Sequence, residues 1–356
     1  MRNVLQLSSV LPGLRAIFLA TFVVSAAACG ASPLDPVADP EAPAAGSPPG
    51  ISSDPNSPDS VPVGSPATPP ADSAAPATPL GPAPAPVPSA QQGILFGFFM
   101  GDYFQLGPTW NATLRGASVG SVVKYLQIAR ERGAHVLIQF GGGRENYLDS
   151  QGNFSLAKWK DRIAPYKSVD LSSYIADGTL AAHYLIDEPE DASRWNGKPI
   201  AYSELEEVAR FSKEVLPGLT TIVRVVPTWL QGASFRWVNL DAAWAQYTAT
   251  KGDVAVYRDT QAAAAKAQGL GLMFSLNVLD GGDGSSGRRG TKSWSHNMSA
   301  LELTTYGKAL IEAPNGCGLF MWREDAGFLA APGIRSAMEL LSAQAKARPA
   351  TSCNQT

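Results

Sequence analysis

The chain contains few of the residues on which several classes of protein depend. Its 356 residues include three histidines and three cysteines, and the formal net charge is −3. A nucleic-acid-binding domain needs a basic patch, so a nucleic-acid partner is not expected. His135, His183 and His296 are scattered along the chain and have no metal-ligand spacing, so no metal site is predicted.

Nucleotide-binding motifs are missing as well. No Gly-x-Gly-x-x-Gly follows the first apolar run of the main domain, and no Gly-Lys-Ser/Thr phosphate loop is present. We therefore expect no nucleotide and no other cofactor. Beyond the N-terminus no run of 18 or more apolar residues occurs, so a membrane-spanning helix is not expected there.

The N-terminus has the organisation of an export signal. Arg2 and Arg15 precede the apolar run 16–24, and the small residues 25–28 follow that run. A charged segment, an apolar segment and a small-residue exit are typical of a secretory signal peptide. We assign residues 1–28 to it.

Cys29 directly follows three alanines, and this arrangement resembles the bacterial lipoprotein signal. The resemblance implies lipidation of Cys29 and a cell-envelope lipoprotein at the outer membrane or cell surface, bound to the membrane through its lipid anchor only. The motif prefers leucine three residues before the cysteine, where this chain has Ala26. The alternative is cleavage near Ala28 and free secretion.

Residues 29–91 are rich in proline and alanine and contain almost no aromatic side chains. Such a segment buries too little apolar surface to offset the entropy of ordering it. Its proline content favours extended, semi-stiff conformations. We predict a disordered tether between the N-terminus and a folded domain.

If Cys29 is lipidated, Cys317 and Cys353 remain. An even number of cysteines in an exported protein favours a disulfide, which would join the C-terminal tail to the beginning of the last strand. The alternative is two unrelated thiols.

Residues 92–356 form the predicted folded domain, in which apolar runs alternate with amphipathic stretches. The runs predict strands at 94–99, 111–115, 135–140, 180–186, 221–226, 240–246, 271–277 and 318–322. The stretches predict helices at 119–132, 202–215, 254–268, 299–312 and 333–347. Ser203 and Glu206 have the spacing of a capping box. Eight strands alternating with helices predict an α/β fold, a (β/α)8 TIM barrel.

Active sites of such barrels lie at the carboxyl ends of the strands. Several carboxylates follow predicted strand ends, and facing carboxylates are what glycoside hydrolysis needs. Six tryptophans also fall near strand ends and suggest a sugar-binding groove: Trp110, Trp195, Trp229, Trp237, Trp294 and Trp322. The candidate catalytic residues are Glu188, Asp280 and Glu324. The candidate binding residues are Asp102, Tyr103, Arg115, Glu145, Asp187, Arg224, Trp229, Asn277 and Trp322.

The run His183-Tyr-Leu-Ile-Asp-Glu-Pro189 resembles the fourth-strand motif of retaining glycoside hydrolases with a (β/α)8 barrel. The resemblance implies that Glu188 is the acid/base. The family's nucleophile is a glutamate at the end of strand seven, where this chain has Asp280. Either Asp280 or Glu324 replaces it, or the site is not a retaining one. Pro189 favours an extended conformation for Glu188. The structural alternative for Asp187 and Glu188 is helix capping, or ion pairing with Arg224 or Arg323.

These features favour an exported glycoside hydrolase-like enzyme that cleaves a polysaccharide or oligosaccharide by carboxylate acid/base chemistry. The alternative is a non-catalytic glycan-binding lipoprotein on a degenerate hydrolase barrel. The absence of a glutamate at the end of the seventh strand favours the alternative.

Overall fold

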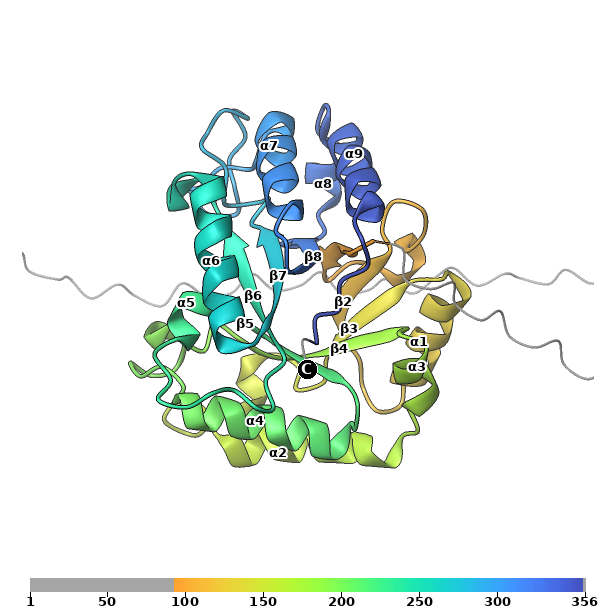
Figure 1. Cartoon of the computed structure of the whole chain (residues 1–356), viewed down its shortest axis with the longest axis vertical. Helices are drawn as coiled ribbons and strands as arrows, with labels where there is room; N and C mark the ends of the chain where they lie inside the picture. The colour runs from red at the N-terminus through yellow and green to blue at the C-terminus, as the bar shows by residue number, and fades with distance from the viewer. Residues whose placement is uncertain (1–92, 355–356) are drawn as a thin grey trace, which may run out of the picture. The chain divides into compact units, whose positions relative to one another are not determined.

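A computed structural model describes residues 93–354, and in it eight parallel strands close into a barrel surrounded by helices (Figure 1). The strands are β1 (Leu95–Phe99), β2 (Ala112–Gly116), β3 (His135–Gln139), β4 (Leu180–Asp187), β5 (Thr220–Arg224), β6 (Ala242–Tyr247), β7 (Gly271–Leu276) and β8 (Gly316–Met321). Pairing of Gly97 with Phe320 belongs to the β1–β8 register that closes the barrel. The predicted (β/α)8 fold is confirmed.

Five helices occupy the predicted stretches. They are α1 (Val122–Glu131), α4 (Tyr202–Val215), α6 (Val254–Gln268), α7 (Ala300–Ile311) and α9 (Ile334–Ala347). The Ser299 hydroxyl caps α7 together with Glu302, and Gly269 ends α6 in the left-handed conformation that a side chain would strain. The shorter helices were not predicted: α2 (Leu156–Ile163), α3 (Ser172–Ala176), α5 (Pro227–Leu230) and α8 (Ala326–Leu329).

The predicted capping box of α4 is wrong. Ala201 is the N-cap, and its backbone N–H donates to the Glu204 carboxylate. Glu206 instead accepts backbone N–H bonds from Val238 and Asn239. A tertiary contact with the segment before β6 has therefore taken the side chain that the local spacing assigned to the helix end.

The inside of the barrel is filled by side chains from all eight strands. Those in the buried cluster include Leu95, Leu114, Leu137, Tyr184, Ile222, Trp244, Met273 and Phe320. Trp244 contacts the rings of Tyr184 and Phe320. Because the interior is packed, it leaves no channel through which a ligand could pass.

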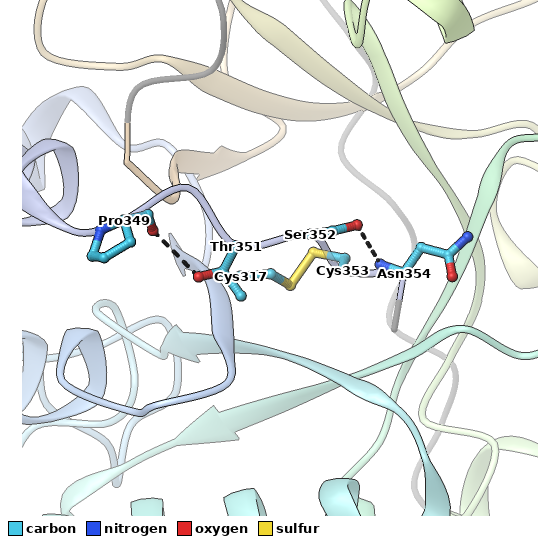
Figure 2. Close-up of a disulfide and its surroundings, with 6 residues drawn as sticks. All are labelled: Cys317, Pro349, Thr351, Ser352, Cys353 and Asn354. Carbon is cyan, nitrogen blue, oxygen red and sulfur yellow. Dashed lines mark hydrogen bonds between the residues drawn. A yellow bond between two sulfur atoms is a disulfide. The ribbon is translucent and has the colours of Figure 1, made fainter. Parts of the chain in front are cut away.

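A disulfide closes the opposite end of the barrel. Figure 2 shows the bond between Cys317, near the start of β8, and Cys353, in the C-terminal tail. The tail lies so close to β7 that a Cβ on Gly271 would stand 2.1 Å from the Cys353 carbonyl oxygen. The predicted pairing is present, and it fixes the C-terminal tail at the amino ends of the strands.

The predicted signal peptide (1–28), the lipidated Cys29 and the tether (29–91) lie outside the described residues and stay predictions. Within residues 93–354, none of the helices has the length and apolar character needed to cross a membrane.

Candidate active site

Arg224, the last residue of β5, is the centre of a charged cluster at the carboxyl ends of the strands. Its side chain is 5% exposed and pairs with Asp187 through Nε. Its Nη2 lies 2.7 Å from Glu188 Oε1, and its Nη1 donates to Gln246 Oε1 at 2.9 Å. The guanidinium also lies 4.3 Å from the ring centre of Trp322. Residues from β4, β5, β6 and the end of β8 therefore meet at one cation.

A second arginine completes the cluster. Arg194, in the short 3-10 helix Ala192–Arg194, donates to Glu188 Oε2 at 2.5 Å and to Asp187 Oδ2 at 2.9 Å. Each carboxylate is thus bound by both arginines, and the four charges balance. The ion pairing with Arg224 that the sequence left open is present, and Arg194 is the partner that sequence reasoning missed.

A β-bulge in β4 turns Asp187 toward the barrel axis. Tyr184 pairs with Ile222 and Asp187 with Arg224, so three steps on β4 match two steps on β5. Without the extra residue, Asp187 and Tyr184 would point to opposite faces. With it, the Tyr184 hydroxyl donates to Asp187 Oδ1 at 2.7 Å.

Glu188 adopts a left-handed backbone conformation, with φ of 50°. The extended conformation expected before Pro189 is therefore wrong. The Glu188 N–H donates to the Arg224 carbonyl at 3.0 Å, and Trp195 Nε1 donates to the Glu188 carbonyl at 2.9 Å. These bonds hold a conformation that a non-glycine residue rarely adopts, which is typical of functional sites.

Burial and neighbouring charges shift the pKa values of Asp187 and Arg224 in opposite directions. Burial acts to raise the pKa of Asp187, but Arg224 and Arg194 outweigh it and hold that pKa below its usual value. Burial acts to lower the pKa of Arg224, and Asp187, Tyr184 and Glu188 outweigh it. Asp187 and Arg224 are therefore both ionised at neutral pH.

Glu190 lies beside this cluster in a different environment. Burial raises the pKa of Glu190 to about 7, and the negative charges of Glu188 and Asp187 also raise it. A hydrogen bond from its own backbone amide and the charge of Arg224 act to lower it. Its Oε2 is buried and has no hydrogen-bond partner. Sequence reasoning did not select Glu190, although it is the third acidic residue of Asp187-Glu-Pro-Glu190.

Asp280 is bound by its own loop. It accepts hydrogen bonds from the Thr291 backbone at 2.7 Å, the Thr291 hydroxyl at 2.6 Å, the Ser295 hydroxyl at 2.5 Å and the Lys292 backbone at 3.3 Å. These bonds fold the segment 281–298 back on the end of β7. Asn277 Oδ1 in turn accepts the Asp280 N–H at 3.1 Å.

Glu324 connects the loops that follow β8 and β1. Its carboxylate accepts the Asp102 N–H at 2.7 Å, and its own N–H donates to the Phe99 carbonyl at 3.0 Å. Asp102 lies 4.0 Å from Arg115, whose guanidinium covers the Tyr103 ring. Four of the predicted site residues therefore form a second polar group, made by β1, β2 and β8.

The six tryptophans of the predicted groove lie in different environments. Trp195 and Trp237 are buried, Trp110 packs on Phe96 and Phe98, and Trp229 packs on Tyr202. Trp294 is 71% exposed beside Lys292. Trp322 stacks on Phe99 at 4.1 Å and reaches the arginine cluster, so it has the placement expected of a sugar-binding residue. Glu145 is exposed in the loop after β3.

Two further features of the described residues concern metal ligands and a serine nucleophile. Between residues 93 and 354, no group of three or more His, Cys, Asp or Glu side chains could hold a metal ion. A Gly-x-Ser-x-Gly spacing occurs at 116–120, between β2 and α1. Ser118 there is exposed and hydrogen-bonded to Ser121, while His183 is buried against Ser212. No histidine is hydrogen-bonded to Ser118 in the described structure.

The site belongs to a (β/α)8 barrel with a charged mouth, and three solved structures of similar fold are glycoside hydrolases. A GH113 beta-1,4-mannanase is 13% identical with a TM-score of 0.48, covering 72% of this chain and all of its own. Xylanase10C from Cellvibrio japonicus is 12% identical with a TM-score of 0.47, covering 76% of this chain and 73% of its own. A GH2 beta-galacturonidase from Eisenbergiella tayi is 12% identical with a TM-score of 0.47, and the match covers 73% of this chain and 52% of that protein.

The likeness to these proteins is one of fold. No protein-family model matches the sequence, and no curated protein is significantly similar to it. At these identities and TM-scores the likeness adds nothing about activity, which has to be argued from the site.

Proposed function

We propose that this protein is an exported enzyme that hydrolyses glycosidic bonds in a polysaccharide or oligosaccharide. The observation that carries the proposal is the set of three carboxyl groups at the end of β4. Two of them, Asp187 and Glu188, are bound by arginines, whereas Glu190 has no ion pair within the described residues. Carboxyl groups in such different environments are what acid/base chemistry at one site requires.

Glu188 is the more accessible of the two paired carboxylates, with 30% of its side chain exposed against 15% for Asp187. As an anion at the mouth, Glu188 would stabilise positive charge that develops on the sugar ring. Trp322 would stack on the apolar face of that ring. Arg224, which is itself bound by Gln246, would hold Glu188 in position against the sugar.

The test is an assay of the full-length protein on a panel of polysaccharides. Hydrolysis is measured as the release of reducing ends. Glu188→Gln should abolish release on every substrate that the wild type cleaves. Glu339→Gln, on the exposed face of α9, is the matched control and should leave activity unchanged. Full activity of Glu188→Gln would remove Glu188 from the chemistry.

A non-catalytic glycan-binding protein is the second candidate. Its support is that both oxygens of Glu188 are already occupied by arginines. It predicts that the wild type is retained on a polysaccharide gel through Trp322 and releases no reducing ends. Retention lost in Trp322→Ala without any hydrolysis by the wild type would establish binding alone.

We also propose that the chain is anchored in the cell envelope through lipidated Cys29, which rests on the sequence alone. Cys29→Ser should move the protein from the membrane fraction to the soluble fraction. Unchanged fractionation would favour cleavage near Ala28 and secretion.

A further inference from the structure

The proposed function needs a carboxyl group that carries a proton, and the end of β4 offers three carboxyl groups. An acid catalyst needs a carboxyl oxygen that is free to hold a proton and give it to a glycosidic oxygen. In Glu188 neither oxygen is free, because Oε1 lies 2.7 Å from Arg224 and Oε2 lies 2.5 Å from Arg194. A proton on Glu188 would have to displace an arginine.

Glu190 has the opposite arrangement. Its Oε2 is buried without a donor, and no ion pair joins it to either arginine within residues 93–354. An ionised carboxylate oxygen that lacks a donor in a buried position is costly, whereas the neutral acid avoids most of that cost. The buried Oε2 without a donor therefore favours the protonated form, against the hydrogen bond from the Glu190 backbone amide, which favours the anion.

The groups that face Glu190 come from three elements. Glu188 and Asp187 lie before it at the end of β4, Arg224 lies at the end of β5, and Tyr257 lies on α6. The Tyr257 hydroxyl donates to the Gln246 carbonyl at 2.8 Å, which fixes the position of this side chain. Of these charged groups, Glu188 and Asp187 act to raise the pKa of Glu190 and Arg224 acts to lower it.

The backbone on both sides of Glu190 is fixed. The Ile200 N–H donates to the Pro189 carbonyl at 2.9 Å, and the Asp191 N–H donates to the Glu188 carbonyl at 3.2 Å. Pro189 is buried, while Glu190 keeps part of its side chain exposed. The segment therefore presents Glu190 at the mouth from a rigid support.

We infer that Glu190, rather than Glu188, is the proton donor of the hydrolysis proposed above. In the reaction the Glu190 proton passes to the glycosidic oxygen as the bond from that oxygen to the anomeric carbon breaks. The bonding electron pair leaves with the oxygen, and the leaving sugar departs as a neutral alcohol. Water then supplies the new oxygen at the anomeric carbon, and its proton returns to the Glu190 carboxylate.

This inference rests on the proposed function and is tested with two substrates of the same sugar. One is the polysaccharide that the panel selects, whose leaving group needs protonation. The other is a dinitrophenyl glycoside, whose leaving group departs without it. Glu190→Gln should lower kcat on the polysaccharide by about 100- to 10,000-fold and affect the dinitrophenyl glycoside far less.

The pH profile separates a proton donor from a structural residue. Glu190→Gln should lose the alkaline limb of kcat/KM, and Glu190→Asp should recover part of the activity with a shifted limb. Glu188→Gln should lower activity on both substrates to a similar extent.

The outcomes are distinct. If the wild type cleaves the polysaccharide and Glu190→Gln keeps both its kcat and its alkaline limb, Glu190 is not the donor and the proposed hydrolase remains. If the wild type cleaves nothing in the panel, the proposed function fails and the role of Glu190 fails with it.

Discussion

Replacing Glu190 by glutamine should change how the stability of the protein depends on pH, without any substrate present. In the folded protein the pKa of Glu190 is raised from 4.5 to about 7. The folded state therefore binds more protons than the unfolded state between these two values, and wild-type stability falls as pH rises through them. Below pH 4.5 the group is neutral in both states and has no effect.

The size of the effect follows from the shift. A raise of this size corresponds to about 3 kcal/mol, and exposure of part of the side chain to solvent reduces it to about 2 kcal/mol. Glutamine has nearly the same shape and does not ionise. Glu190→Gln should therefore match the wild type at pH 4.5 and exceed it by about 2 kcal/mol at pH 8.5.

Urea unfolding of the full-length protein at both pH values measures this difference directly. Glu339→Gln is the control, because this exposed residue of α9 should behave like the wild type at each pH. A difference between wild type and Glu190→Gln that is the same at pH 4.5 and pH 8.5 would refute the reasoning on Glu190.

Three further predictions concern the parts that support the site. Arg224→Met should lower the free energy of unfolding measured in urea by about 3–5 kcal/mol, because it leaves Asp187 buried with an incomplete set of partners. The control Arg210→Met, on the exposed face of α4, should lower it by under about 1 kcal/mol. An equal loss in the two variants would contradict the role of the cluster. The double variant Cys317→Ser/Cys353→Ser removes a link across 36 residues. It should lower stability by about 3–4 kcal/mol, and a thiol reductant should lower the Tm of the wild type but not of the variant. Asp280→Asn should speed tryptic cleavage of the native protein at Arg288 and Arg289, because the bonds from Thr291 and Ser295 lose their charged acceptor; an unchanged cleavage rate would show that the loop does not depend on Asp280.

Local patterns in the sequence predicted the frame of the barrel well. Each apolar run became a strand, because a strand of a closed parallel barrel is buried on both faces and must be apolar along its length. The amphipathic stretches became α1, α4, α6, α7 and α9, and Gly269 and Ser299 ended or began helices as their chemistry requires. The pairing of Cys317 with Cys353, predicted from the even number of cysteines that remain besides Cys29, is present.

The candidate site was only partly predictable. The sequence identified Asp187, Glu188, Arg224 and Trp322 because strand ends meet at the mouth of a barrel. It did not identify Arg194, which comes from a 3-10 helix without a periodic pattern. It also treated tryptophans near strand ends as a groove, although Trp195 and Trp237 are buried. Burial of a single aromatic residue depends on which loop folds over it.

The sequence by itself determined the order of strands and helices, since that order depends on periodicity along short stretches. Tertiary structure decided the chemistry of the mouth. One extra residue in β4 turns Asp187 inward, and two arginines from separate elements then occupy both Asp187 and Glu188. Glu190, left without an ion pair, acquires a raised pKa. A pKa depends on the burial and charges around a group, and these come from residues far apart in the chain.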